Sequence, residues 1–299
     1  MKHAIDCSNY SGRIAVEQFI DLRDNYDCGA VIVQAVDPPA QYPPTVTQQQ
    51  IEAAFEAGGI AVHAYIFWWF QTGIEFLQRQ LALLEPYAGQ LHRVWLDIED
   101  TTGGPARSTD GPITPPLGAQ ARLIQQPPPP PSMQARRPGV SAEARIADVQ
   151  SWLNVLDQYP TLLGEAGIYG AAWHWDPYMG GTTVFAEQGR KIWAADYNGE
   201  EDLTTWEHFG GWSGEAALHQ YAGTSTLAGV QQIDLNVIAE SEMTVAEDRE
   251  CDWAWQDKKE LVVTAAGELL VVADQLDAEA ARIQQLANDV RLRAQKILE

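Results

Sequence analysis

The stretch Val94-Trp95-Leu96-Asp97-Ile98-Glu99-Asp100 places two acidic side chains, two positions apart, inside an apolar run. A short run of this kind is typical of a buried strand. Side chains alternate along a strand, so Asp97 and Glu99 lie on the same face. Burying carboxylates is costly unless they are paired or hydrogen-bonded, and only Arg93 offers a basic partner nearby in the sequence. The stretch therefore predicts a strand that presents two functional acids.

Short β-rich runs alternate with amphipathic helical patterns from the N-terminus to about residue 240. The candidate strands are residues 3–8, 30–36, 61–68, 93–100, 166–171, 191–197, 217–222 and 232–238. Helical patterns cover 16–25, 47–57, 73–87 and 141–159, with a capping box predicted at Thr47-x-x-Gln50 and an N-cap at Ser141. Eight strands with interleaved helices predict an α/β protein, an irregular (β/α)8 barrel of the TIM type. The spacers after the fifth strand are shorter, so we expect the second half to be less regular.

Two more acids, Asp6 and Asp234, lie in the first and last candidate strands. In a barrel, acids near the ends of strands one, four and eight converge on one mouth, where the active sites of such barrels lie. Repulsion among them raises the pKa of at least one carboxyl group, which can then act as an acid near neutral pH. Glycoside hydrolysis uses such a protonated carboxyl group together with a second carboxylate on the opposite side of the bond. A lone Asp at a strand end more often caps a turn, which is the role expected of Asp100.

Composition excludes several functional classes. The 299 residues include 19 Lys+Arg against 41 Asp+Glu, a net charge of −22, which argues against a nucleic-acid partner. The sequence has no apolar run long enough to span a membrane, and it opens without the apolar stretch of a secretory signal, so we expect synthesis in a host cytoplasm without export through one. Cys7, Cys28 and Cys251 lack C-x-x-C spacing and are expected to be buried thiols, not metal ligands.

Two segments depart from the barrel pattern. Residues 101–140 form an insertion rich in Pro, Gly and Ser with five prolines at 127–131, which excludes a helix or a central strand. It is either a long surface loop or an arm that contacts a neighbouring subunit or borders the active-site mouth. Residues 241–299 form a second region, a linker and then a helix at 256–299.

That C-terminal helix carries a seven-residue repeat. Branched apolar residues recur at every seventh position, and an alanine follows each of the first five after four residues: Val262, Leu269, Leu276, Ile283, Val290 and Ile297, with Ala266, Ala273, Ala280, Ala287 and Ala294. A sustained repeat of this kind predicts a coiled coil that joins copies of the chain or another protein. The alternative is a long helix packed along its own barrel.

Six motifs together resemble glycoside hydrolase family 25, the Chalaropsis-type lysozymes, which include phage endolysins. In chain order they are Ile5-Asp6-Cys7-Ser8-Asn9-Tyr10-Ser11-Gly12, the segment 57–67, Trp95-Leu96-Asp97-Ile98-Glu99, Gly167-Ile168-Tyr169, Ile192-Trp193-Ala194-Ala195-Asp196-Tyr197, and His219-Gln220-Tyr221 followed by Ile233-Asp234-Leu235-Asn236. Each motif is weak alone, but their order over residues 1–240 is specific.

The resemblance implies a muramidase that cleaves the β-1,4 bond between N-acetylmuramic acid and N-acetylglucosamine in peptidoglycan, without metal or cofactor. It makes Glu99 the general acid, and Asp97 the group that polarises the substrate acetamido group or an intermediate. Asp6 and Asp234 would then set the charge of the site and position the nucleophile, which is either water or the acetamido oxygen. Candidate aromatic walls of the sugar groove are Tyr65, Trp68, Trp173, Trp193 and Tyr197.

Three residues differ from the family pattern, namely Ser11, Ile66 and His219, and they are expected to alter the groove around the acids. With the expected coiled coil and no signal peptide, the leading hypothesis is a bacteriophage enzyme, lytic or virion-associated, that acts at the bacterial cell wall. The alternative is a lysozyme-like barrel with little turnover that serves as a structural or wall-binding part of a phage tail or particle.

Overall fold

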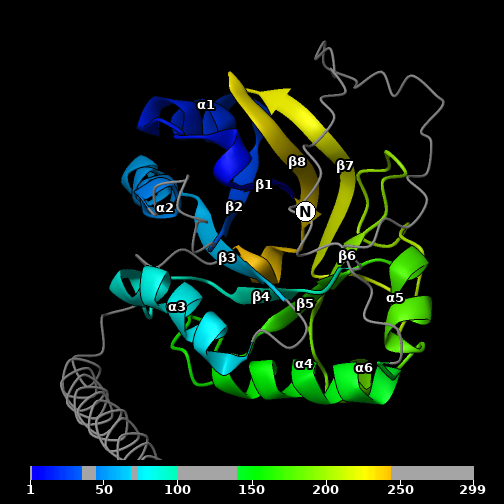
Figure 1. Ribbon diagram of the computed structural model, residues 1–299. Helices are drawn as coiled ribbons and strands as arrows, with labels where there is room; N and C mark the ends of the chain where they lie inside the picture. The colour runs from blue at the N-terminus through cyan, green and yellow to red at the C-terminus, as the bar shows by residue number, and fades with distance from the viewer. Residues whose placement is uncertain (1, 36–44, 69–72, 100–139, 244–299) are drawn as a thin grey trace, which may run out of the picture. The chain divides into compact units, whose positions relative to one another are not determined.

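The computed structural model describes residues 2–35, 45–68, 73–99 and 140–243. Eight strands close into one barrel in the chain order β1 to β8 (Figure 1). Every strand predicted from the sequence is present, with shifted ends: β1 Lys2–Cys7, β2 Cys28–Gln34, β3 Ala61–Phe67, β4 Val94–Asp97, β5 Gly167–Gly170, β6 Ile192–Ala195, β7 Leu218–Leu227 and β8 Val230–Ile238. The prediction of a closed α/β barrel is confirmed for this part of the chain.

The barrel closes in an irregular way. Neighbouring strands from β1 to β7 run parallel, but β8 is antiparallel to both β7 and β1. Strands β7 and β8 form a hairpin through Ala228 and Gly229, which both have positive φ. Two-residue hairpin loops favour such backbone angles because they match the strand twist. The alternation of strands and helices predicted from the sequence therefore ends before this hairpin, because no helix lies between β7 and β8.

Helices lie outside the strands (Figure 1). The four predicted helices are α1 Val16–Tyr26, α2 Thr45–Ala57, α3 Ile74–Leu84 with the 3-10 turn η2 Glu85–Tyr87, and α4 Ala142–Leu156. Ser141 caps α4 as predicted, since its side chain accepts a hydrogen bond from the Ala144 amide. Later helices are short, α5 Ala172–Met179 and α6 Val184–Glu187, as the short spacers suggested. The remaining 3-10 turns are η1 Asn9–Ser11 and η4 Glu240–Glu242.

The capping box predicted at Thr47 and Gln50 is wrong. Helix α2 begins at Thr45, so both residues lie within it. The Thr47 hydroxyl donates to the Gln34 carbonyl at 2.8 Å, and the Gln50 amide donates to the carbonyls of Ser8 and Gly12. These buried side chains therefore hold α2 against the ends of β1 and β2 and do not cap the helix.

The lumen of the barrel is filled by small residues and large rings. Trp95 and Tyr169 both contact Trp193 edge to face, at ring-centroid distances of 6.1 and 4.6 Å. Gly167 lies beside Trp95, and a Cβ atom at this position would overlap the indole ring. Only glycine fits there, because a packed core has no space to move such a ring. Aromatic packing therefore fixes the strands beneath the acids.

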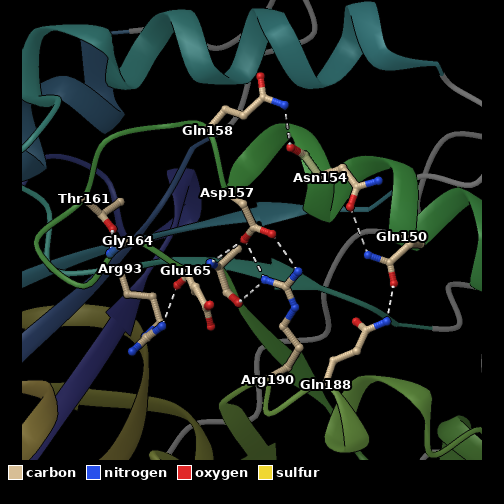
Figure 2. Close-up of polar contacts among 11 residues, drawn as sticks. Arg93, Gln150, Asn154, Asp157, Gln158, Thr161, Gly164, Glu165, Gln188 and Arg190 are labelled. Atoms are coloured by element: carbon tan, nitrogen blue, oxygen red, sulfur yellow. Dashed lines mark hydrogen bonds and ion pairs between the residues drawn. The ribbon is translucent and has the colours of Figure 1, made fainter.

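A forked ion pair fastens the outer helix α4 to the strands that follow it (Figure 2). Arg190, just before β6, binds both carboxylate oxygens of Asp157 at 2.6 Å and also donates to the Ala166 carbonyl. Asp157 in turn accepts from the Ala166 amide, just before β5. A bidentate pair of this kind is directional and holds one geometry. It fixes the starts of β5 and β6, which carry Tyr169 and Trp193.

A buried charged cluster closes the opposite end of the barrel from the acids. The Glu242 carboxylate, 1% exposed, accepts from Arg93 Nε at 3.1 Å and lies 3.5 Å from His92 Nε2. His63 donates to the Glu242 carbonyl and accepts from the Trp95 indole at 3.1 Å. Burial alone would raise the pKa of Glu242, but His92 and Arg93 lower it to about 2. Burial lowers the pKa of His63 to about 3, so that ring stays neutral.

Cys7 and Cys28 are buried free thiols, as predicted. Cys251, Asp100, nearly all of the insertion at 101–140 and the C-terminal helix at 256–299 lie outside the described residues. Among the residues that the structure describes, no helix has the length and apolar character needed to cross a membrane.

The closing cluster predicts an acid-sensitive fold. The pKa of Glu242 is lower in the folded state than in the unfolded chain, so its contribution is complete above about pH 4.5 and is lost as the pH falls towards 2. Glu242→Gln leaves Arg93 buried without its partner and should lower the free energy of unfolding by about 3 kcal/mol at pH 7. Urea unfolding at pH 7 and pH 3 measures this difference, which should shrink at pH 3. Glu240→Gln, an exposed neighbour, is the control; an equal loss at both pH values would contradict the assignment.

Candidate active site

Four acidic side chains meet at the mouth of the barrel. Asp6 on β1 pairs with Asp234 on β8 in the antiparallel register, and Asp97 ends β4 with Glu99 two residues beyond. The four interact electrostatically, since the charges of Asp234 and Glu99 act on Asp6, and that of Glu99 acts on Asp97. The structure thus brings together acids that are separated by more than 200 residues in the chain.

Two amide side chains hold the Asp6 and Asp234 carboxylates. Gln220 Nε2 donates to Asp6 Oδ2 at 2.9 Å and to Asp234 Oδ2 at 3.1 Å. Asn236 Nδ2 donates to Asp6 Oδ2 at 2.8 Å. Sequence reasoning missed both amides as site residues. The available signal was a polar residue at a core-facing strand position. Gln220 lies two residues after Leu218, and Asn236 two residues after Asp234, so each pair shares one face of its strand.

A backbone irregularity supplies a further donor. The Thr224 amide donates to Asp234 Oδ1 at 2.5 Å, and Thr224 has a φ of +50°, which is uncommon for a β-branched residue. The β7–β8 register shifts three times around this point, between Gln220 and Ala222, between Ala222 and Ser225, and between Ser225 and Thr226. Bulges of this kind re-aim groups next to active sites. The β7–β8 hairpin therefore places the Thr224 backbone amide against the Asp234 carboxylate.

Burial raises the pKa of every acid in the cluster. The pKa of Glu99 rises to about 7, with the Asp234 charge adding to the rise and a hydrogen-bonding interaction with Tyr169 opposing it. Burial raises the pKa of Asp234 to about 6, against the hydrogen bond from Thr224. The pKa values of Asp6 and Asp97 are also raised, first by burial and then by the neighbouring carboxylates. Near neutral pH the cluster therefore holds protons that isolated carboxyls would have lost.

Cations do not compensate these charges within the described part of the chain. The ion pairs there join other residues, such as Arg190 with Asp157 and Arg93 with Glu242, and none includes the four acids. The described residues also contain no group of three or more His, Cys, Asp or Glu arranged to hold a metal ion. Asp97 Oδ1 is buried and has no hydrogen-bond partner among them. The cluster is thus equipped to exchange protons and to accept donors from a ligand.

Three of the five predicted aromatic residues lie beside the acids. Trp173 is 39% exposed and its ring lies 5.6 Å from that of the half-buried Tyr197. The Tyr197 hydroxyl is 3.4 Å from that of Tyr169. Tyr65 is buried deeper, edge-on to Trp193, and its pKa is raised by burial and by the charges of Asp6 and Asp97. Trp173 and Tyr197 therefore form a partly exposed aromatic pair next to the cluster.

The other two predicted aromatic residues are buried. Trp68 and Trp193 are each 1% exposed, so neither presents a ring face to solvent. The Trp68 indole donates to Asp148 on α4 at 3.0 Å, and the Trp193 indole donates to Asn236 Oδ1 at 2.7 Å. The structure places Trp193 under the acids, where it orients the amide that binds Asp6, and not in a groove wall.

The residues that differ from the family pattern do not reshape the mouth as expected. Ile66 and His219 are fully buried, and both His219 ring nitrogens face backbone carbonyls, those of Asp202 and Asp196. The Ser11 hydroxyl donates to the Gln232 carbonyl at 2.7 Å and so ties η1 to β8. These side chains brace the barrel wall, because strand alternation turns Ile66 and His219 away from the lumen.

Comparison with solved structures agrees with this architecture. A muramidase from Trichobolus zukalii superposes with a TM-score of 0.52 at 17% identity, covering 80% of this chain and 94% of that one. A family 25 glycosyl hydrolase from Bacillus anthracis gives 0.50 at 17% identity over 81% and 91%. The modular autolysin LytC from Streptococcus pneumoniae gives 0.53 at 14% identity over 79% and 46%. The chain has the glycoside hydrolase family 25 fold.

The structural match extends the resemblance seen in the sequence. No protein-family model and no curated protein matches the sequence itself. The family 25 fold is therefore formed here by a sequence whose resemblance to the family is limited to short motifs.

The raised pKa values predict that the acid cluster destabilises the fold. The pKa of Asp97 is higher in the folded state than in the unfolded chain, so folding loses stability as the pH rises above about 4. Asp97→Asn removes this charge at similar size and should raise the free energy of unfolding by about 1–3 kcal/mol at pH 7. Urea unfolding at pH 7 and pH 4 measures the gain, which should be smaller at pH 4. Asp24→Asn, at an exposed acid paired with Arg23, is the control; a loss of stability in Asp97→Asn would contradict the prediction.

Proposed function

We propose that this protein is a peptidoglycan hydrolase, an N-acetylmuramidase that cleaves the β-1,4 bond between N-acetylmuramic acid and N-acetylglucosamine. The observation that carries the proposal is the meeting of four buried carboxyls, Asp6, Asp97, Glu99 and Asp234, at the barrel mouth, where burial raises the pKa of Glu99 to about 7. A carboxyl group whose pKa is raised towards neutrality can keep its proton and donate it to a leaving oxygen. The family 25 fold adds support at the level of architecture.

Each acid has a distinct place in this reaction. Glu99 protonates the glycosidic oxygen as the bond breaks. Water then adds to the anomeric carbon, either directly or after the substrate acetamido oxygen has attacked it, and Asp6 and Asp234 position this nucleophile. Asp97, with its buried and unpartnered Oδ1, accepts the N–H of the substrate acetamido group and polarises it. Asp6 and Asp234, held by Gln220 and Asn236, keep negative charge below the sugar ring, where the transition state becomes positive.

The aromatic pair next to the acids suits a sugar substrate. The exposed Trp173 and the half-buried Tyr197 offer apolar ring faces beside the cluster. Pyranose rings present apolar C–H faces that pack on such rings, and a polar tip on Tyr adds a hydrogen bond. The LytC structure was solved with a synthetic peptidoglycan ligand, and we propose glycan strands of the same polymer as the ligand of this protein.

Removal of the general acid tests the activity. Glu99→Gln should lower the rate of wall clearing at least about 100-fold, since general acid catalysis contributes roughly 10²–10⁴. A zymogram on bacterial cell walls compares the native chain, Glu99→Gln and the exposed control Glu187→Gln, which should clear like the native chain. The native activity should also decline as the pH rises through about 7, because Glu99 then loses its proton. Wall binding without clearing by the native chain would contradict the proposal and favour a wall-binding module with little turnover.

We further propose that the protein acts as an oligomer, joined through residues 256–299 to other copies or to another virion protein, and that it is phage-encoded. The support for the oligomer comes from the heptad repeat in the sequence. Such a chain is made in a host cytoplasm and acts at the bacterial wall, with neither nucleic acid nor membrane as a partner.

Truncation tests the oligomer directly. Light scattering of the full chain should give a mass that is a multiple of 33.0 kDa. A chain that stops after residue 255 should give a monomer mass. It keeps all eight strands of the barrel and the Arg93–Glu242 ion pair at its closed end. An unchanged monomeric mass in both proteins would contradict the coiled coil.

A further inference from the structure

One oxygen of Asp6 accepts two hydrogen bonds from amide side chains. Asn236 Nδ2 and Gln220 Nε2 both donate to Oδ2, at 2.8 and 2.9 Å. A carboxylate oxygen has about two lone-pair sites, so these two donors occupy Oδ2. In the described part of the chain no hydrogen bond reaches Oδ1, and Asp6 keeps 7% of its surface exposed. The two oxygens of Asp6 are therefore not equivalent.

The indole of Trp193 determines which end of the Asn236 amide faces Asp6. The indole N–H donates to Asn236 Oδ1 at 2.7 Å, and an indole N–H can only donate. The oxygen of the amide must then face Trp193, and its NH2 group must face Asp6. The reversed amide would set oxygen against carboxylate oxygen and N–H against N–H, and both hydrogen bonds would be lost. Trp193 on β6 thus directs an amide of β8 at a carboxylate of β1.

The packing of the lumen holds the indole in one orientation. Trp193 is 1% exposed and Asn236 is fully buried, so water does not compete for the hydrogen bond between them. Three rings contact Trp193 edge to face, at centroid distances of 5.8, 6.1 and 4.6 Å, those of Tyr65, Trp95 and Tyr169. A ring in a dense core has little freedom to turn. The direction of the indole N–H is therefore set by the core beneath the acids.

We propose that Trp193 and Asn236 form a pair of positioning residues that decides which oxygen of Asp6 is available: the pair fixes Oδ2 as an acceptor from the protein and leaves Oδ1 to meet the nucleophile or to carry a proton. The inference rests on the proposed role of Asp6 in positioning the nucleophile. Trp193 acts through Asn236, because the amide and not the indole contacts the carboxylate. With Gln220 as its remaining donor, the Asp6 carboxylate could turn and exchange its two oxygens.

The other groups that face Asp6 do not distinguish its oxygens in this way. The carboxyl groups whose charges interact with Asp6 are those of Asp97, Glu99 and Asp234, on β4, just beyond it and on β8. The neutral groups that interact with its charge are Cys7 on β1, Tyr65 on β3 and Tyr197 after β6, and burial raises the pKa of each, so they keep their protons near neutral pH. Among the described hydrogen bonds, only those of Asn236 and Gln220 reach the Asp6 side chain.

Asn236→Leu tests the pair, because leucine has a similar size and no amide. The hydrogen bond from Asn236 lowers the pKa of Asp6 against the effect of burial. Its loss should move the titration of Asp6 to higher pH by about one unit in ¹³C NMR of aspartate-labelled protein, where Asp6→Asn identifies the resonance. Trp193→Phe keeps a ring in the core and removes only the N–H donor. It should move the same titration in the same direction by a smaller amount.

A double variant distinguishes a pair that acts in series from two separate effects. If Trp193 acts through Asn236, Trp193→Phe combined with Asn236→Leu should shift the Asp6 titration no further than Asn236→Leu alone. Trp95→Phe is the matched control, since Trp95 is also a fully buried indole of the lumen but bonds His63, at 3.1 Å. It should lower stability without moving the Asp6 titration. Additive shifts in the double variant, or an equal shift in Trp95→Phe, would overturn the proposal.

Kinetics give a second readout and separate this inference from the proposed function. With soluble peptidoglycan fragments, Asn236→Leu should lower kcat roughly 10- to 100-fold and leave KM nearly unchanged, because the glycan still binds while its nucleophile is misplaced. An Asp6 titration that does not move in Asn236→Leu would overturn the role of the pair even if the native protein clears cell walls. The expected shifts in a native protein that clears no walls would support the fixed Oδ2 and contradict the muramidase proposal alone.

Discussion

The rest of this structure depends on one constraint. Four carboxyl groups are buried in one barrel mouth, and no cation among the described residues forms an ion pair with them. Charges in such a place are costly unless donors surround them or protons neutralise them. The barrel supplies both solutions. Gln220, Asn236 and the Thr224 amide donate hydrogen bonds to Asp6 and Asp234. Burial raises the pKa values of all four acids, so the cluster also retains protons near neutral pH.

The two ends of the barrel show what a cation changes. Glu242 and Glu99 are the same residue type, and burial raises the pKa of both. Beside Arg93 and His92 the pKa of Glu242 falls to about 2, whereas that of Glu99, beside other carboxyls, rises to about 7. The closed end therefore stabilises the fold through an ion pair, and the open end gives up stability to keep a proton near neutral pH. A destabilised site on a rigid scaffold is the usual cost of catalytic chemistry.

Much of the fold and the positions of the acids could be predicted from the sequence. Apolar runs of strand length and helical periodicity identified all eight strands and the four long helices, and alternation placed Asp97 and Glu99 on one face. The β7–β8 hairpin escaped prediction because Ala228-Gly229 is a weak turn signal. The roles of Gln220 and Trp193 escaped because hydrogen-bond partners from distant strands depend on the closed barrel. Ile66 and His219 were assigned to the groove by motif position, although strand alternation turns them outward.

Identification of the new reducing ends released from purified peptidoglycan tests the central claim most directly. A muramidase leaves N-acetylmuramic acid at every new reducing end, so borohydride reduction of the digest followed by mass spectrometry should detect its sugar alcohol, N-acetylmuramitol. Fragments that end in N-acetylglucosamine, or no released fragments at all, would contradict the assignment of Glu99 and its neighbours to this bond.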